Sequence, residues 1–226
     1  TISYSNWVIN EGHFQLENDL SKVFLKESKG TIWQFKPQAE GDNTFEGAFY
    51  NFSTLPPPNN ALNISLIDAF ENGDLRKELW VKELTDANNQ KFYHSFKYKE
   101  FQNTTSSKEY SIIIRLEEIY YNRIEAYLNL QQTDLALVDW NMLRLRNGLT
   151  SFELLPLDWK MALLQDRRSE FFFLYGQRFL DLKRLDKLAY EMLLTKPSWQ
   201  NYYQFLPLPQ AEILLNTNLL PQNDGY

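Results

Sequence analysis

The most regular pattern of apolar and polar positions lies in the second half of the chain. Through residues 113–148 and again through 158–194, apolar side chains recur at intervals of three and four, which is typical of one buried helix face. Gly148 and Gly176 stand where the pattern stops. We therefore expect four helices in two antiparallel pairs, the organisation of tetratricopeptide hairpins. The positions expected to be buried are Leu116, Ile119, Tyr120, Ile124 and Tyr127 in the first helix, Leu135, Val138, Met142 and Leu145 in the second, and Phe179, Leu182, Leu185, Leu188 and Met192 in the fourth.

Residues 1–108 lack a regular pattern of apolar and polar positions. The β-prone run 31–35 predicts a short strand, and the partial alternation of apolar and polar residues through 91–101 predicts an exposed strand. Residues 37–63 hold glycines, asparagines and three successive prolines, and we expect them to form a long loop. Long loops without their own secondary structure are often functional.

Two shorter segments complete the expected organisation. Residues 65–73 predict a helix with Ser65 as its N-cap. In residues 195–226, Pro207 and Pro209 favour an extended path. The tail is therefore expected to be extended rather than helical.

The fold class predicted is mainly α. Two tetratricopeptide-like helix pairs in residues 109–194 pack against an irregular, loop-rich lobe with few short strands in residues 1–108. The extended tail, 195–226, packs on the same domain.

Composition narrows the functional classes. The 226 residues are 43% hydrophobic and 15% aromatic, enough for a sizeable core, and the formal net charge is −6. This charge argues against a nucleic-acid partner, which needs a basic face. The absence of cysteine excludes thiolate metal sites and disulfides. The two histidines, His13 and His94, stand far apart in polar surroundings, and both are expected to be solvated. We expect no metal and no cofactor.

Charged residues concentrate in 166–184, but their spacing favours a structural role. Several of them stand three apart, where opposite charges pair along a helix. Bidentate contacts of Glu170 and Asp181 with guanidinium groups would fix the angle between helices. The adjacent Glu117 and Glu118 point about 100° apart on a helix, so they do not form the facing carboxylate pair of a glycosidase. With no nucleophile or phosphate-binding motif either, we expect that the chain is not an enzyme.

Five spaced segments then resemble one family, the SusD/RagB-like outer-membrane nutrient-binding lipoproteins. They are residues 66–79, 114–128, 140–149, 166–185 and the closing run 205–226, and they stand in the family's order. The resemblance extends over most of residues 31–226 and identifies the chain as the C-terminal portion of a family member. The matching residues are Asp74, Arg76, Arg115, Leu116, Glu118, Glu125, Ala126, Asn141, Arg144, Arg146, Gly148, Arg167, Arg168, Glu170, Gly176, Arg178, Asp181, Leu182, Arg184, Pro207, Pro209, Glu212, Asn216, Leu219, Gln222, Asn223, Gly225 and Tyr226.

The resemblance implies a non-catalytic receptor at the bacterial cell surface. Such a protein binds oligosaccharides or polysaccharide and passes them to a SusC-like TonB-dependent porin. It is held at the outer membrane by a lipid anchor upstream of this chain, and no other membrane contact is implied. Two alternatives stay open: a peptide-binding receptor of the same family, and a tetratricopeptide-type scaffold for protein interactions.

A sugar receptor needs aromatic faces for the apolar side of a pyranose ring and amides for its hydroxyl groups. The loop 37–63 offers both, and for each aromatic residue a place in the core remains the competing interpretation. Family motifs do not fix ligand residues, so these are predicted from residue type alone. The predicted ligand-binding residues are Trp33, Phe49, Tyr50, Asn51, Trp80 and Tyr93.

Overall fold

The computed structural model describes residues 1–58, 60–172 and 175–226, which form two compact units. Unit 1 is Thr1–Tyr175 and unit 2 is Gly176–Tyr226. The boundary lies inside the helical segment that the sequence predicted for 109–194. The described residues include no helix long and apolar enough to cross a bilayer.

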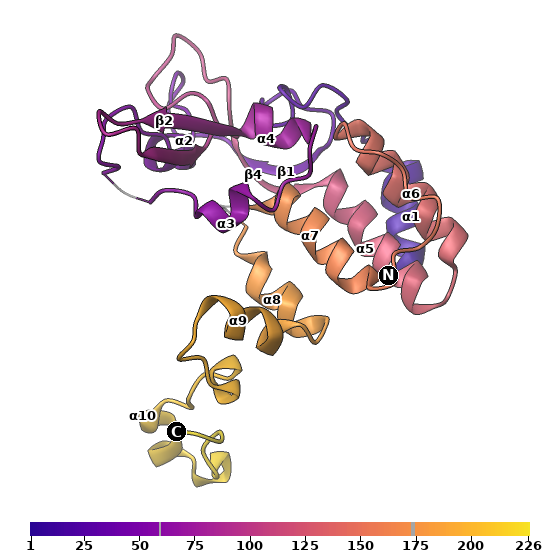
Figure 1. Cartoon of the computed structure of the whole chain (residues 1–226), viewed down its shortest axis with the longest axis vertical. Coiled ribbons are helices and arrows are strands. Elements are labelled where there is room, and N and C mark those ends of the chain that lie inside the picture. The colour runs from indigo at the N-terminus through magenta and orange to yellow at the C-terminus, as the bar shows by residue number, and fades with distance from the viewer. Residues whose placement is uncertain (59, 173–174) are drawn as a thin grey trace. The chain divides into compact units, whose positions relative to one another are not determined.

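The helical layer of unit 1 consists of α1 (Ile2–Glu11), α5 (Leu116–Asn129), α6 (Thr133–Arg146) and α7 (Trp159–Phe171). These helices pack together in Figure 1, with α5 against both α1 and α6. The predicted first pair is confirmed as α5 and α6, although its first residues, 113–115, belong to strand β4 (Ser111–Arg115). The core of this layer is made of Tyr121, Ile124, Tyr127, Leu128, Ala136, Trp140, Leu143, Leu163 and Phe171.

The predicted buried face of α6 is wrong. Leu135, Val138 and Leu145 are 50%, 69% and 62% exposed, while Trp140 is wholly buried. Charged residues are buried beside it: Asp139 accepts two 2.7 Å hydrogen bonds from the guanidinium of Arg123 on α5. Because paired charges can be buried, the apolar pattern alone selected the opposite face of this helix.

The loop-rich lobe of unit 1 contains two antiparallel strand pairs. β1 (Thr31–Phe35) pairs with β4, which confirms the predicted strand. β2 (Val81–Thr85) pairs with β3 (Lys91–Ser95). The predicted exposed strand 91–101 is shorter than expected and largely buried, with His94, Lys97 and Tyr98 each at most 4% exposed.

Three short helices interrupt this lobe (Figure 1). α2 (Phe45–Tyr50) lies inside the predicted loop 37–63, which is therefore not free of helix. α3 (Ile64–Ile67) replaces the longer helix predicted for 65–73, and its N-cap is Asn63 rather than Ser65. α4 (Leu75–Trp80) runs directly into β2 and is capped by Asp74.

The lobe and the helices share one core. Leu20, Val23 and Phe24 pack with Trp80 from α4 and with Phe172 after α7. Residues from the two ends of unit 1 thus meet in one cluster, so the loop-rich lobe is anchored on the helical layer rather than standing apart from it.

Unit 2 departs from the single fourth helix that the sequence predicted. α8 (Gln177–Arg184) and α9 (Leu188–Thr195) are separated at Asp186, which has a positive φ of 60°. That left-handed conformation cannot continue a right-handed helix.

The tail of unit 2 is also more helical than predicted. It contains the 3-10 turns η1 (Asn201–Gln204) and η2 (Thr217–Leu219), and the helix α10 (Gln210–Leu215). Pro209 has extended angles as expected, but it stands at the N-cap of α10, where a missing N–H costs nothing.

The closing motif folds the tail back on itself. The side chain of Gln222 donates to Leu208 O at 2.9 Å and accepts from Leu208 N at 2.7 Å. Asn223 donates to Leu206 O, and the Tyr226 hydroxyl donates to Phe205 O. The motif residues therefore hold the end of the chain against residues 205–208.

Candidate functional site

The charged motif residues of unit 1 converge on a buried ion network centred on Glu170. This residue is 1% exposed, and its carboxylate lies 2.9 Å from Arg115 Nη1 and 3.3 Å from Arg76 Nη1. Arg146 Nη2 lies 3.7 Å from the same carboxylate, at Glu170 Oε1. Burial opposes the ionised form, but these guanidinium groups hold the pKa of Glu170 well below its usual range. The partners come from distant segments rather than from the same helix.

A second carboxylate, Asp166, extends the network. It accepts hydrogen bonds from Trp140 Nε1 at 2.6 Å and from Arg144 Nη1 at 3.2 Å. Arg144 also holds Glu71 through two 2.9 Å hydrogen bonds. α6, α7 and the turn before α4 are therefore fixed to one another by paired charges.

Lys97 is a buried cation that the sequence did not point to. Its ammonium group donates to Glu170 O and Phe172 O, both at 2.8 Å, and lies 4.0 Å from the centroid of the Phe172 ring. Burial lowers its pKa well below the usual range. This arrangement fixes the chain after α7.

The ion network has the character of a structural core, as the sequence predicted. Glu170, Arg115 and Arg76 are each 1% exposed. In unit 2, Asp181 and Arg184 form the expected pair at 2.9 Å. Among the described residues, no group of three or more histidine, aspartate or glutamate side chains is arranged to hold a metal ion.

Aromatic side chains gather on the surface of the loop-rich lobe. Trp33 and Phe35 alternate along β1, are 49% and 54% exposed, and contact each other edge to face at 5.2 Å. On α2, Phe45 stacks on Phe49 at 5.5 Å, and Phe49 meets Tyr50 edge to face at 5.0 Å. We call these five residues the aromatic patch.

A hydrogen bond links the two elements of the aromatic patch. Ser111 on β4 is the register partner of Phe35, and its hydroxyl donates to Glu46 of α2 at 2.7 Å. The end of β1 is thereby tied to α2. Phe45 is 73% exposed, while Phe49 and Tyr50 are half-buried. Phe45, Phe35 and Trp33 are therefore the most exposed members of the patch.

Beside α2 lies a cleft of about 320 Å³ between two loops, which we call the loop cleft. Phe45 and Phe101 give it exposed apolar rings, at 73% and 47% exposure. Its lining residues are Pro37, Gln38, Asp42, Asn43, Thr44, Phe45, Ala48, Glu100, Phe101, Gln102 and Asn103.

The two walls of the loop cleft are joined by hydrogen bonds through Asn43. Its amide donates to Gln102 O at 3.1 Å and to Thr104 Oγ1 at 2.9 Å, and accepts from Lys108 N at 2.9 Å. Asn103 donates to Asp42 across the same gap. The cleft is thus held open by polar contacts rather than by apolar packing.

Of the other predicted ligand residues, Trp80 is corrected by the structure. It is wholly buried, and its Nε1 donates to Leu20 O at 2.9 Å. Asn51 is a half-buried structural amide, whose Nδ2 donates to Gly47 O and Tyr98 O. Tyr93 on β3 is half-buried and packs against the core cluster of Trp80.

His94 also corrects an expectation. It is 2% exposed rather than solvated, and its ring lies 4.7 Å from that of Phe52. Nδ1 lies 3.0 Å from Ser95 O, and Nε2 has no hydrogen-bond partner among the described residues.

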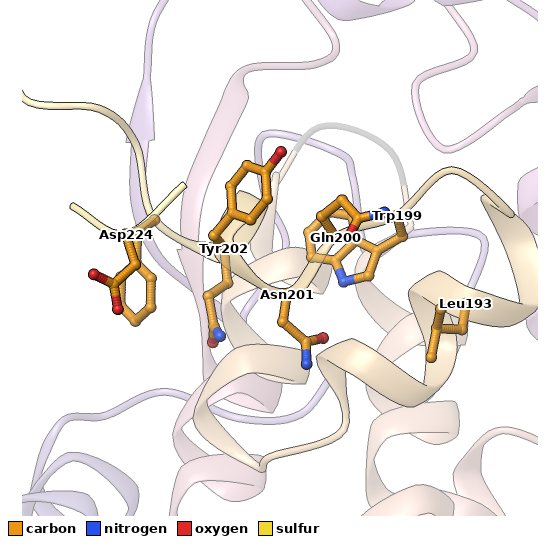
Figure 2. A pocket seen from close by; sticks show the side chains of 8 residues that line it. Leu193, Trp199, Gln200, Asn201, Tyr202 and Asp224 are labelled. Atoms are coloured by element: carbon orange, nitrogen blue, oxygen red, sulfur yellow. The ribbon is translucent and has the colours of Figure 1, made fainter. Parts of the chain in front are cut away.

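Unit 2 holds a second cleft, of about 580 Å³, which we call the tail cleft. Figure 2 shows Asp224, Tyr202, Asn201 and Trp199 following one another along it, with Leu193 at the far end. Gln200, Gln204 and Phe205 complete its lining. No residue of this cleft was among the predicted ligand residues, although the run of aromatic and amide residues at 199–204 is a signal for such a site.

A third hollow, of about 370 Å³, lies in unit 1 beside α5 and α6 and is lined in part by Phe14, Tyr120, Met142 and Arg146. Its single cation, Arg146, already bonds Glu117 at 2.8 Å.

Comparison with solved structures finds the same fold in several proteins. Surface glycan-binding protein A from Bacteroides thetaiotaomicron is similar with a TM-score of 0.73 at 18% identity, over 99% of this chain and 58% of that protein. Its complex with laminarihexaose gives 0.73 at 20% identity, over 98% of this chain and 58% of that one. A laminarin-binding SusD-like protein gives 0.66 at 20% identity, over 100% of this chain and 58% of that one.

The chain therefore spans less than two thirds of the length of these structures. A search of curated protein sequences found no match. The SusD family model, however, matches residues 69–226. This match contains the ion network around Glu170 and the closing motif that folds back the tail. The chain belongs to the SusD family.

Proposed function

We propose that this chain is the ligand-binding part of a surface receptor that captures a carbohydrate without chemically changing it. The receptor is held at the outer membrane by a lipid anchor, faces the medium, and passes its ligand to a SusC-like TonB-dependent transporter. Membership of the SusD family, together with an exposed aromatic patch beside a polar cleft, carries this proposal.

The structural relatives support a carbohydrate as the ligand class. One of them is a surface glycan-binding protein seen with laminarihexaose, and another is a laminarin-binding protein. Laminarin is a neutral glucan, so neutral sugar rings are the first ligands to consider.

The physical character of the aromatic patch supports the same class. Pyranose rings have an apolar face of C–H groups that stacks on aromatic rings. Trp33 and Phe45 present such rings at 49% and 73% exposure. Beside them the loop cleft adds the side chains of Gln38 and Gln102, which can bond to hydroxyl groups.

The proposed absence of catalysis rests on where the charges lie. The main carboxylate cluster of unit 1 is buried and neutralised by arginines. In the loop cleft, Glu100 is paired with Lys108 at 2.7 Å, and Asp42 accepts from Asn103. Carboxylates held in this way are poor general acids or bases.

One observation favours the interaction scaffold as a second candidate. Leu135, Val138, Met142 and Leu145 form an exposed apolar stripe along α6. Such a stripe is typical of a surface that contacts protein. Contact with a transporter through α6 is compatible with a ligand site on the loop-rich lobe.

Affinity electrophoresis of the whole chain through gels containing laminarin, other neutral glucans, xylan or polygalacturonate tests the proposal. We expect one neutral polysaccharide to retard the protein, and Trp33→Ala or Phe45→Ala to weaken this binding about tenfold through lost ring contact. Trp7→Ala is the matched control, because Trp7 is 64% exposed but lies on α1. Failure of every polysaccharide to retard the protein would contradict the proposal.

A further inference from the structure

We infer that the tail cleft of unit 2 is a second, separate binding site for neutral sugar rings. This inference rests on the proposed carbohydrate function and adds a site to it. All eight lining residues belong to unit 2, between Leu193 and Asp224. The site is therefore complete within one compact unit.

The first support is the mixture of groups in the cleft. Trp199, Tyr202 and Phe205 supply aromatic rings, while Gln200, Asn201 and Gln204 supply amides. In Figure 2, Asn201 follows Tyr202 along the cleft, and Gln200 lies next to Trp199. Alternation of rings and amides is what a chain of sugar units requires, since each unit has both an apolar face and hydroxyl groups.

The second support is that the polar side chains of the tail cleft are free to bind. Those of Gln200, Asn201, Gln204 and Asp224 have no hydrogen-bond partner among the residues that the structure describes. The loop cleft differs, because its Asn43 is used to join the two walls. The amides of the tail cleft are thus available for a ligand.

A buried hydrogen-bond donor in the lining of the tail cleft also supports a ligand site there. Trp199 Nε1 is inaccessible to solvent and has no acceptor in the described part of the chain. Unpaired buried donors are rare and ask for an explanation. If ligand binding turns the Trp199 ring so that this nitrogen becomes accessible, a sugar hydroxyl would supply the missing acceptor.

The cleft is backed by a rigid aromatic frame. Tyr202 meets Tyr203 at 4.7 Å and Tyr226 at 5.4 Å, both edge to face. Gly225, with φ of 90°, passes directly over the Tyr202 ring, where any side chain would collide with it. A site whose rings are already fixed loses little conformational entropy on binding.

The charge of the tail cleft favours neutral over acidic sugars. Asp224 is the one charged residue in the lining, and it is acidic. The nearby Lys183 is already engaged, with its ammonium 4.6 Å from the centroid of the Phe205 ring and donating to Gln204 O. A carboxylated sugar would meet repulsion from Asp224, so neutral glycans are the expected class.

Calorimetric titration of the whole chain with laminarihexaose, maltohexaose and hexagalacturonate tests this inference. The tail variant Asn201→Ala with Asp224→Ala alters two exposed side chains and should leave the fold intact by circular dichroism. The patch variant is Trp33→Ala with Phe45→Ala. Asn218→Ala is the matched control, since Asn218 is exposed in the same unit but outside the cleft.

Under the inference, a neutral hexasaccharide binds the patch variant with residual affinity, and adding the tail substitutions removes that binding. The tail variant alone loses part of the bound stoichiometry, Asn218→Ala loses none, and hexagalacturonate binds the tail cleft at least about tenfold more weakly. Loss of all binding in the patch variant, with wild-type binding in the tail variant, would overturn the inference and leave the proposed function standing. Absence of binding to the wild-type chain would overturn both.

Discussion

Arg115 Nη1 lies 2.9 Å from Glu170 Oε1, and both side chains are 1% exposed. One residue ends β4 and the other lies on α7, so this contact joins the loop-rich lobe to the helical layer. Arg76 and Arg146 approach the same carboxylate. The position of the lobe, and with it the aromatic patch, therefore depends on a buried charge.

We predict that Glu170→Gln lowers the free energy of unfolding by about 3–5 kcal/mol, because it leaves buried guanidinium groups without their counter-charge. Urea denaturation followed by tryptophan fluorescence measures this change. Glu83→Gln is the control, since Glu83 pairs with Lys91 on the surface at 2.9 Å. It should stay close to wild type. Equal losses in both variants would contradict the structural role of the network.

The Asn43 amide should be the strongest single stabiliser of the loop cleft. We predict that Asn43→Ala costs about 1–3 kcal/mol, because the amides and carbonyls that it serves lose their partner. Hydrogen exchange at the Lys108 and Glu109 amides should also accelerate. Asn88→Ala, in the exposed turn between β2 and β3, should change neither quantity.

His94 should make unit 1 less stable in mild acid. Burial lowers its pKa below the ordinary 6.5. As the pH falls through 6.5, the unfolded chain takes up a proton that the folded chain does not, so the free energy of unfolding decreases. We expect His94→Gln to reduce this slope between pH 7 and pH 5. An unchanged slope in the variant would show that His94 titrates alike in both states.

Titration of Glu109 should change the free energy of unfolding with pH in the direction opposite to that of His94. Burial raises its pKa from 4.5 to about 7, although it accepts hydrogen bonds from Lys99 N and Glu100 N. Between pH 4.5 and about pH 7, Glu109 stays protonated in the folded chain but is ionised in the unfolded chain. Its contribution to stability therefore declines as the pH rises from 4.5 to about 7, by up to about 1.4 kcal/mol per pH unit. Glu109→Gln should remove this decline in the same denaturation series.

The sequence predicted what local periodicity and motifs encode. The pair α5 and α6, the strand β1 and the SusD family follow from residues close together in the chain. Burial was harder to predict, because it depends on distant partners. The inner face of α6 is set by Asp139 pairing with Arg123 and by Trp140 bonding Asp166, and neither contact is visible in a hydropathy pattern.

The candidate site was predicted only in part, for the same reason. Trp33 and Trp80 are the same residue type, yet one is 49% exposed and the other is wholly buried. Trp80 packs edge to face against Phe24 and donates to the carbonyl of Leu20, and both partners are distant in the sequence. The tail cleft was missed because its frame depends on Gly225 and Tyr226 returning to Tyr202.

Tryptophan indole N–H signals in a ¹H–¹⁵N correlation spectrum test the central claim most directly, with the whole chain titrated by a neutral hexasaccharide series that includes laminarihexaose. Carbohydrate binding at the aromatic patch predicts that the Trp33 signal moves, while the buried signals of Trp80 and Trp140, bonded to Leu20 O and Asp166, stay in place. The Trp7 signal, from an exposed residue on α1, should also stay in place. If no sugar in the series moves the Trp33 signal, the aromatic patch is not a carbohydrate site and the account is contradicted.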